Sequence, residues 1–434
     1  MEIREILPGP KSGCVTVPAS KSWAHRMLIT AALSVNPCEI ICDGISNDIS
    51  ATIKCLNALG ASINIEENIN EGAVIKVYPV VKKIDHHNQN ALYAHLSCGE
   101  SGSTLRFMIP IAGALGINAC YHMEGRLSER PLETLTDVLS AHGMSFRKDG
   151  PYLYCMGQLQ SGTYDIPGNI SSQYVSGLLM ALPLVNGNSI LNVTGKIESG
   201  DYIDMTVKAI EDAGVALVKN GNTYYIEGGQ KYSVPNSLIV EKDWSSAAFP
   251  LCMGAFSDEG MNVTGLNLNS IQGDKEIVNI LKNFGADIVT DDKAPDQKNN
   301  LLSITVKKGD LKGQVIDASR IPDLVPVISV VAAGAKGETR IIHAERLRLK
   351  ESDRLATTTT MLKALGADID ETEDGLVIHG KAKLNGGTVD SFNDHRIAMS
   401  AAVAAGICQE KVVVTGAECT NKSFPGFWNM LEKI

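Results

Sequence analysis

Polar, helix-capping residues recur along the chain, and each is followed by a helix-length run that is mostly apolar. Six such segments begin, at intervals of 70 to 81 residues, at Ser20, Ser101, Ser171, Asp243, Pro322 and Asp394. The runs are rich in Ala and Gly, as in SSQYVSGLLMAL. Because Ser, Asp and Pro are favoured where helices start, the pattern predicts six repeated helices.

A second motif follows each of the first five copies: a helix that ends in Gly, and then a strand. The sixth copy reaches only FPGFWNMLEKI before the chain stops at Ile434. A repeat unit cannot bury its own apolar face, so the sixth copy needs a strand from elsewhere. Residues Cys14 to Val17 alternate as a strand does. We therefore expect the residues up to about Ala19 to complete the sixth repeat.

Six repeats divide most simply into two similar domains of an α/β protein, each built from three repeats. One domain would be continuous, residues 20–240, and the other would combine residues 1–19 with residues 241–434. The length of 434 residues alone would suggest about three domains. A cleft between two such domains would be the natural site for a ligand.

Composition and charge narrow the class of protein. The net charge of −10 and pI of about 5.5 argue against a nucleic-acid partner. No apolar segment resembles a signal peptide or approaches the roughly 20 residues of a membrane-spanning helix. The ten cysteines are scattered, so we expect buried free thiols in a cytoplasmic protein that binds no membrane. The polar segment from Thr290 to Asn300 is expected to be a surface loop.

Cations and hydrogen-bond donors gather where the predicted helices begin. Helix N-termini favour anions through their free N–H groups and the macrodipole. The sequence contains no nucleophile elbow, Walker loop, HExxH or dinucleotide motif. The pattern therefore predicts a polyanionic small-molecule ligand, held by residues that include Lys21, Arg26, Arg126, Lys350, Arg354, Arg396 and Lys422.

The segment from Arg346 to Arg354, RLRLKESDR, carries six charges in nine residues. Taken alone, it is more typical of a solvated, self-paired charge run than of a site. It precedes an amphipathic helix that Ser352 could cap and Gly366 could end. Glu351 would then be a possible acid or base at a helix N-terminus. Asp323, in the fifth repeat, is open to two interpretations, a capping carboxylate or a general base.

Ten motifs together resemble, in order, the signatures of the 5-enolpyruvylshikimate-3-phosphate synthase family. They are KSWAHR, GESGSTLRF, GRLSERP, SSQYVSGLLM, SGDYID, IQGD, IPDLVP, RLKESDRL, FNDHRIAM and KSFPGF. The resemblance runs from about Lys21 to Pro425. It implies an inside-out α/β barrel in each of two domains, each of three βαβαββ units, with the active site in the cleft. His25 and Arg346 depart from frequent family residues, and we assign neither a role.

The resemblance also implies the reaction: the enolpyruvyl group of phosphoenolpyruvate passes to the 5-hydroxyl of shikimate 3-phosphate, and phosphate is released. No metal or cofactor is implied, and we expect a monomer. Shikimate 3-phosphate would be held by Lys21, Ser22, Arg26, Ser171, Ser172, Gln173, Ser199, Tyr202, Asp323 and Lys350. Phosphoenolpyruvate would be held by Lys21, Gly102, Arg126, Gln173, Arg354, Arg396 and Lys422.

Three of these residues would carry the chemistry implied by the resemblance. Asp323 would take the proton of the 5-hydroxyl. Glu351 would give a proton to the methylene carbon during addition and remove one during elimination. Lys21 would assist proton transfer at the leaving phosphate.

Two alternatives compete with this interpretation. The sister family that transfers enolpyruvyl to UDP-N-acetylglucosamine carries Asn after the first lysine and a mobile loop bearing Cys or Asp. Here Ser22 follows Lys21, and the corresponding segment, Glu124 to Pro131, has Arg126 and no Cys. A repeat scaffold that binds an anion without catalysis is the other alternative, and the carboxylates of Asp323 and Glu351 argue against it.

Overall fold

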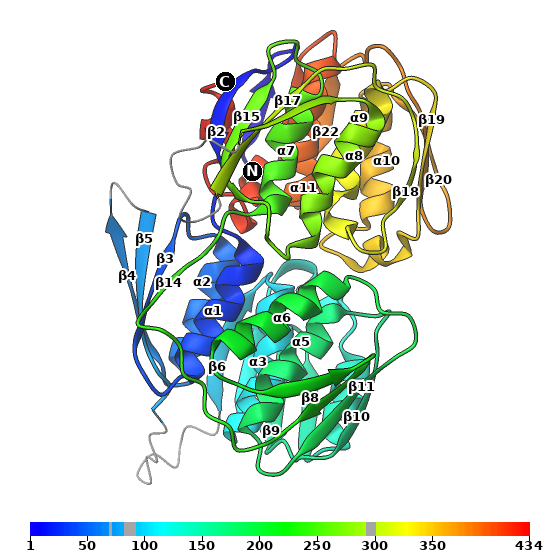
Figure 1. Ribbon diagram of the computed structural model, residues 1–434. Coiled ribbons are helices and arrows are strands. Elements are labelled where there is room, and N and C mark those ends of the chain that lie inside the picture. Colours follow the sequence, from blue (N-terminus) through cyan, green and yellow to red (C-terminus); the bar gives the residue numbers. More distant parts are fainter. Residues whose placement is uncertain (69–71, 82–92, 292–300) are drawn as a thin grey trace. The chain divides into compact units, whose positions relative to one another are not determined.

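The chain forms two compact units in the computed structural model, which describes residues 1–68, 72–81, 93–291 and 301–434 (Figure 1). The N-terminal unit is Lys21–Val240, and the C-terminal unit combines Met1–Ser20 with Glu241–Ile434. Where the chain passes from one unit to the other, its two crossings are hydrogen-bonded to each other. The Ser20 N–H donates to the Glu241 carbonyl at 2.7 Å, and the Asp243 N–H donates to the Pro18 carbonyl at 3.0 Å.

The N-terminal unit repeats one pattern three times: helix, strand, helix and two further strands, with a parallel strand added to each sheet. The first repeat comprises α1 (Lys21–Leu33), β3 (Cys38–Cys42), α2 (Asn47–Ala58), β4 (Ser62–Asn68) and β5 (Gly72–Tyr78). The second comprises β6 (Ala94–Gly99), α3 (Gly102–Leu115), β7 (Ala119–Met123), η1 (Gly125–Glu129), α4 (Glu133–Ser140), β8 (Met144–Asp149) and β9 (Tyr152–Gly157). The third comprises β10 (Thr163–Pro167), α5 (Ser172–Ala181), η2 (Leu182–Leu184), β11 (Ser189–Thr194), α6 (Gly200–Asp212), β12 (Leu217–Asn220) and β13 (Thr223–Ile226), and β14 (Ser237–Ile239) follows. The three sheets have the strand orders β14-β3-β5-β4, β6-β7-β9-β8 and β10-β11-β13-β12.

The C-terminal unit follows the same pattern. The fourth repeat comprises α7 (Trp244–Gly254), β15 (Met261–Asn267), η3 (Gly273–Glu276), α8 (Ile277–Phe284), β16 (Asp287–Asp291) and β17 (Leu301–Lys307). The fifth comprises β18 (Val315–Asp317), η4 (Pro322–Leu324), α9 (Val325–Gly334), β19 (Glu338–Ile342), η5 (Glu345–Leu349), α10 (Arg354–Ala364), β20 (Asp368–Glu371) and β21 (Leu376–His379). The sixth comprises β22 (Gly387–Asp390), α11 (His395–Ala404), η6 (Ala405–Ile407), β23 (Val412–Thr415), η7 (Ala417–Lys422) and α12 (Phe427–Leu431).

Two strands from the start of the chain, β1 (Ile3–Ile6) and β2 (Gly13–Thr16), complete two different sheets. Strand β1 pairs antiparallel with β23, which confirms that the N-terminal segment completes the sixth repeat. The alternating segment from Cys14 was expected to do this and does not, because it forms β2, parallel to β15 in the fourth repeat. That place is open because β14, the strand before α7, pairs with β3 in the N-terminal unit.

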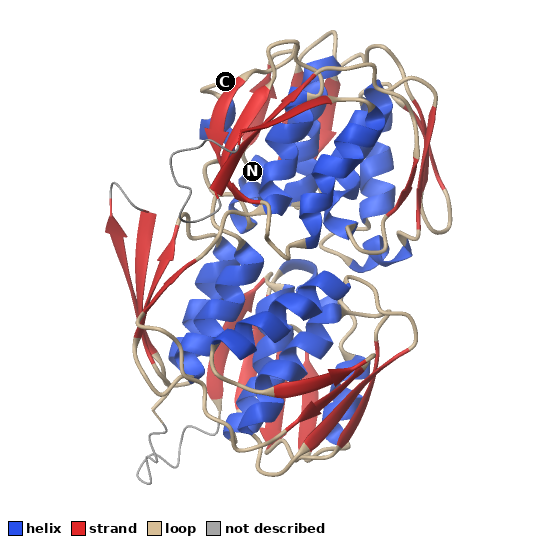
Figure 2. Cartoon of the chain, viewed as in Figure 1, coloured by secondary structure: helices blue, strands red, loops and turns tan. Residues whose placement is uncertain are grey.

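The first helix of each repeat lies inside its unit, with the sheets on the outside (Figure 2). Every residue of α7 and α11 is buried. This explains why the repeated runs are apolar on all sides and rich in small residues. The second helix of the fourth repeat is amphipathic instead: α8 buries Ile277, Ile280, Leu281 and Phe284, which lie on one face.

Side-chain caps form at three of the repeated starts, whereas Asp243 occupies the N-cap position of α7 without a side-chain capping bond. Ser101, Ser171 and Asp394 each accept a backbone N–H of the helix that follows. The fifth copy opens with the 3-10 turn η4 before α9. Ser352 does not cap α10; Asp353 does, because its side chain accepts the Ala356 N–H at 3.1 Å.

Other expectations concern loops and thiols. Gly366, with φ of 88°, follows the end of α10 as predicted. Thr290 and Asp291 end strand β16, so they are not part of a loop, and the rest of the segment to Asn300 lies outside the described residues. Nine of the ten cysteines are buried free thiols, and Cys14 is exposed. Among the described residues, no helix is both long and apolar enough to span a membrane.

Candidate active site

In the C-terminal unit, the carboxylate of Asp323 lies between two guanidinium groups. Arg354 Nη1 donates to Asp323 Oδ1 at 2.7 Å, and Arg396 Nη2 donates to Oδ2 at 3.0 Å. Arg396 Nη1 also donates to the main-chain carbonyl of Asp323 at 3.1 Å. Turn η4 and the first turns of α10 and α11 supply these three residues. Asp323 therefore acts as a charged partner of two helix starts, and not as the cap of its own helix.

Arg354 also donates hydrogen bonds to two further carboxylates. Its Nη2 donates to Glu351 Oε2 at 2.7 Å and its Nε donates to Asp394 Oδ2 at 2.8 Å. The Arg354 side chain is 1% exposed, whereas Glu351 is 19% exposed. One buried guanidinium thus orients the two carboxylates assigned as acid and base, Asp323 and Glu351. The interpretation of this segment as a solvated charge run is wrong for Arg354 and Glu351, because Arg354 is buried and Glu351 is only 19% exposed.

The surrounding cations control the proton affinity of Asp323. Burial alone would raise its pKa, but Arg396, Lys350 and Arg354 together hold the pKa well below its usual value. Burial lowers the pKa of Lys350 to about 8, against the opposing effect of Asp323. Near neutral pH, Asp323 is therefore ionised, and Lys350 is a cation that loses its proton readily.

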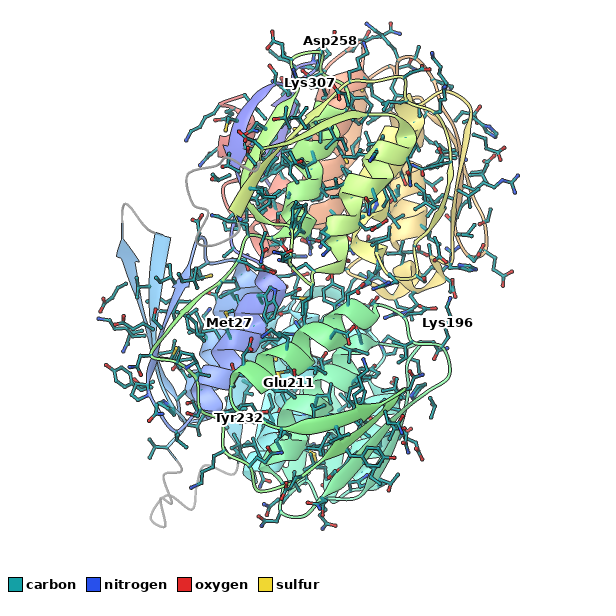
Figure 3. The ribbon with its side chains drawn as sticks, viewed as in Figure 1. Met27, Lys196, Glu211, Tyr232, Asp258 and Lys307 are labelled. Carbon is teal, nitrogen blue, oxygen red and sulfur yellow. The ribbon has the colours of Figure 1, made fainter. Side chains whose placement is uncertain are left out.

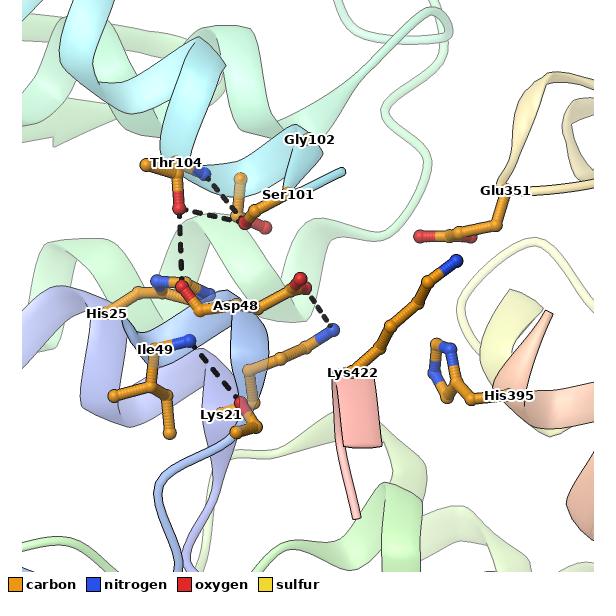
Figure 4. Close-up of polar contacts among 12 residues, drawn as sticks. Lys21, His25, Asp48, Ile49, Ser101, Gly102, Thr104, Glu351, His395 and Lys422 are labelled. Carbon is orange, nitrogen blue, oxygen red and sulfur yellow. Dashed lines mark hydrogen bonds and ion pairs between the residues drawn. The ribbon is translucent and has the colours of Figure 1, made fainter. Parts of the chain in front are cut away.

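Lys422, at the end of η7, is a further cation of the predicted site in the C-terminal unit. Its Nζ donates to the carbonyl of Asn393 at 2.6 Å, and the side chain points toward Glu351 (Figure 4). Asn393 has φ of 54°, in the left-handed region, immediately before the Asp394 cap of α11. Backbone held in this region is often found at functional sites, where the surroundings enforce it.

In the N-terminal unit, Lys21 opens α1 and pairs with Asp48 at the start of α2. Lys21 Nζ lies 2.9 Å from Asp48 Oδ2 (Figure 4). Both side chains are largely buried, at 17% and 12% exposed. The ion pair fixes the ammonium group near the N-terminal ends of two neighbouring helices, where an anion would be favoured.

Arg26 is held almost entirely by protein groups. Its Nε donates to Thr206 Oγ1 at 2.8 Å, and its Nη1 and Nη2 donate to the carbonyls of Ser22 and Tyr202, each at 2.7 Å. The guanidinium therefore ties α1 to α6. Burial lowers its pKa to about 10, so it stays charged at neutral pH.

The hydroxyl and amide groups that the sequence assigns to shikimate 3-phosphate lie at the starts of α5 and α6. Ser171 is the N-cap of α5, and Gln173 Nε2 donates to Ser103 Oγ on α3 at 2.9 Å. Ser199 is the N-cap residue of α6, with φ of 54°, although its side chain makes no capping bond. Because α5 contacts both α3 and α6, these donors share one end of the helical core, together with Ser22, Ser172 and Tyr202.

Two arginines surround Gly102, the first residue of α3. A methyl group on Gly102 would lie 2.6 Å from Arg130 Nη1 and 2.7 Å from Arg106 Nη1. Glycine is thus the residue that lets both guanidinium groups approach the helix N-terminus. Arg126 is different, since its side chain is 52% exposed and lies 3.5 Å from Glu129.

Several residues of these clusters were not assigned from the sequence. Asp48, Asp394, Arg106 and Arg130 contact assigned residues, but each looks like an ordinary helix or cap residue in the sequence. Their roles depend on contacts between elements far apart in the chain, which no local spacing reveals. Within the described ranges, no group of three or more His, Cys, Asp or Glu side chains is placed to hold a metal ion.

Comparisons with known proteins agree on one family. The family model described as EPSP synthase (3-phosphoshikimate 1-carboxyvinyltransferase) matches residues 7–431. A protein of Clostridium perfringens (strain SM101 / Type A) named 3-phosphoshikimate 1-carboxyvinyltransferase is 42% identical, over 99% of this chain and 97% of that protein. A protein of the same name from Clostridium acetobutylicum is 41% identical, over 100% and 97%.

A solved structure of EPSP synthase from Acinetobacter baumannii has the same fold. It superposes with a TM-score of 0.79 at 27% identity, covering 100% of this chain and 98% of that one. This agrees with the α/β architecture of three-repeat units predicted from the sequence. The chain therefore belongs to the EPSP synthase (3-phosphoshikimate 1-carboxyvinyltransferase) family.

Proposed function

We propose that the protein transfers the enolpyruvyl group of phosphoenolpyruvate to the 5-hydroxyl of shikimate 3-phosphate and releases phosphate. The observation that carries this proposal is the arrangement of Asp323 and Glu351 on the single guanidinium of Arg354, with Arg396 and Lys350 beside them. A binding scaffold needs the cations alone, whereas two oriented carboxylates suit proton transfer. The family match supports the same reaction and gives no support to the alternatives.

Both substrates are polyanions, and bringing them together costs electrostatic energy. The N-terminal unit offers Lys21, Ser22, Arg26, Ser171, Ser172, Gln173, Ser199 and Tyr202 to shikimate 3-phosphate, with Asp323 and Lys350 from the C-terminal unit. Phosphoenolpyruvate takes Lys21, Gly102, Arg126 and Gln173 from the N-terminal unit, with Arg354, Arg396 and Lys422 from the C-terminal unit. In this proposal, the residues of the N-terminal unit and those of the C-terminal unit bind the same two substrates.

The proposed addition moves two protons and forms two bonds, one C–H bond and one C–O bond, at the expense of the C=C double bond. Glu351, entering in its protonated form, gives its proton to the methylene carbon, and positive charge develops at the neighbouring carbon. The 5-hydroxyl oxygen attacks that carbon while its proton passes to Asp323. Elimination then breaks the C–O bond to phosphate while Glu351 takes a proton from the new methyl group, which restores the double bond. Lys21 assists proton transfer to the leaving phosphate, and the proton that Asp323 accepted balances this transfer, so both carboxyl groups return to their starting forms.

Anionic substrates are expected to activate Asp323. The three cations that hold its pKa low make it a weak base on its own. A substrate carboxylate or phosphate beside Arg396 and Lys350 would offset their positive charge. The proton affinity of Asp323 would then rise as the substrates bind, which suits a base that must act only on the full complex.

The test is phosphate release from phosphoenolpyruvate with shikimate 3-phosphate or UDP-N-acetylglucosamine as acceptor. Of the two acceptors, we expect only shikimate 3-phosphate to support phosphate release. Asp323→Asn and Glu351→Gln should each lower kcat by about 10² to 10⁴-fold while still binding shikimate 3-phosphate. Asp317→Asn, an exposed carboxylate six residues before Asp323, is the matched control and should retain activity. Near-normal phosphate release by both active-site variants would refute the proposed roles.

A further inference from the structure

Arg396 is linked through Ser245 to another buried carboxylate, Asp274 of the IQGD motif. Asp274, in turn η3, is 4% exposed. Its Oδ2 accepts the hydroxyl of Ser245, on the first turn of α7, at 2.5 Å. Ser245 Oγ in turn accepts Arg396 Nη2 at 2.7 Å. The same Nη2 reaches Asp323, so a continuous chain of hydrogen bonds links Asp274 to the proposed base.

The carboxylate of Asp274 is costly to keep where it is. Burial first, and then Asp323, raise its pKa from 3.8 to about 7, while Arg396 and Ser245 act in the opposite direction. In the unfolded chain this carboxyl ionises near its ordinary value. Ionising it therefore lowers the stability of the folded chain as pH rises from about 4 to about 7. Carboxyl groups whose pKa is strongly raised by burial and a neighbouring charge are concentrated at functional sites.

The direction of the bonds shows what Asp274 can do. The single hydroxyl hydrogen of Ser245 points to Asp274, which leaves the lone pairs of Ser245 Oγ for Arg396. An ionised carboxylate can only accept, whereas an amide at position 274 could turn its NH2 group toward Ser245 Oγ and compete with Arg396 for the serine lone pairs. Arg396 Nη2 uses Ser245 Oγ and Asp323 Oδ2 as acceptors, at 2.7 and 3.0 Å, so an oriented Ser245 hydroxyl helps to fix the guanidinium.

We propose that Asp274 is a positioning residue: acting through Ser245, it fixes the guanidinium of Arg396. This inference rests on the proposed function, in which Arg396 holds phosphoenolpyruvate beside the base Asp323. Asp274 does not touch a substrate in this scheme. Its loss should weaken the hold of Arg396 on phosphoenolpyruvate more than it slows turnover of the bound complex.

The test compares Asp274→Asn, Ser245→Ala, Ser245→Thr and the double variant Ser245→Ala/Asp274→Asn in the phosphate-release assay. Asp274→Asn and Ser245→Ala should each raise KM for phosphoenolpyruvate about tenfold, with a smaller change in kcat. Since the two residues act in series, the double variant should be no worse than the more impaired single variant. Ser245→Thr keeps the hydroxyl and should retain a KM close to that of the wild type.

Asp258→Asn is the matched control, because Asp258 lies in the loop after α7 (Figure 3) and its side chain is 89% exposed. Asp274→Asn should also melt no lower than the wild type at pH 8, since it removes a carboxylate that is costly to ionise. A wild-type KM in both Asp274→Asn and Ser245→Ala, or fully additive effects, would overturn the inference. Should Asp274→Asn not fold, KM for phosphoenolpyruvate in Ser245→Ala and Ser245→Thr decides the inference. An equal KM in these two variants would overturn it. An inactive wild type would instead refute the proposed function, and the inference would fall with it.

Discussion

Lys350 shows at the level of one residue how burial tunes an anion site. Its ammonium lies 3.8 Å from Asp323 Oδ1, and its pKa is lowered to about 8 by burial, with Arg354 and Arg346 acting in the same direction. The ammonium is fully charged below that pH and loses its proton as pH rises through it. Binding an anion would draw the proton back, because the charged form is then favoured.

The affinity for shikimate 3-phosphate should therefore fall as pH rises above about 8. The phosphate group itself keeps its charge there, since its second pKa is about 6. In Lys350→Arg the dependence should flatten, because a guanidinium keeps its proton to pH above about 12. The measurement is KM for shikimate 3-phosphate from pH 7 to about 9.5 for both proteins. The same slope in both would mean that Lys350 does not contact the acceptor.

Residue types were more predictable than residue partners. Lys21, Asp323, Glu351, Arg354 and Arg396 stand out in the sequence because each lies at or beside the start of a repeated helix. That Arg354 binds both Asp323 and Glu351 could not be predicted, since the three meet only when turn η4 and helix α10 pack together.

At the level of elements, two adjacent polar residues before α10 make different contacts. Asp353 caps the helix, whereas the Ser352 hydroxyl lies 3.0 Å from Asp394 Oδ2 and 3.0 Å from Thr357 Oγ1. Both residue types are good N-caps, so spacing alone could not choose between them. The tertiary contact with Asp394 decides the matter, because it occupies Ser352.

Asp353→Ala should lower the free energy of unfolding by about 1 kcal/mol, the usual cost of losing an N-cap. Asp353→Asn keeps a capping oxygen and is the control. The comparison requires urea unfolding at neutral pH, together with KM for both substrates. If Asp353→Ala were as stable as the wild type, the cap would not contribute to stability.

Strand placement in the N-terminal segment was harder to predict than helix placement. Cys14 to Val17 alternates more clearly than Ile3 to Ile6, yet the latter pairs with β23. The partner strands lie hundreds of residues away in the chain, and the local pattern carries no information about which of two open sheet edges a strand will join.

For the whole molecule, the proposed reaction requires residues from both units to act on one pair of substrates. We expect shikimate 3-phosphate to draw the two units together, because its phosphate and the carboxylate of its ring would attract cations from each. Small-angle scattering should show a smaller radius of gyration with the ligand than without it. Shikimate without the phosphate is the control and should have less effect. An unchanged radius of gyration with shikimate 3-phosphate would count against closure.

The pairing of β1 with β23 has a consequence for synthesis on the ribosome. The N-terminal unit has all its strands once residue 240 has emerged, since β14 is the last strand that it needs. The C-terminal unit, in contrast, must join residues 3–6 to residues 412–415. Domains generally fold as they are completed. Strand β1 must therefore stay unpaired until residues 412–415 have been made. Once residue 240 has emerged, the nascent chain carries one folded unit while β1 still waits for its partner.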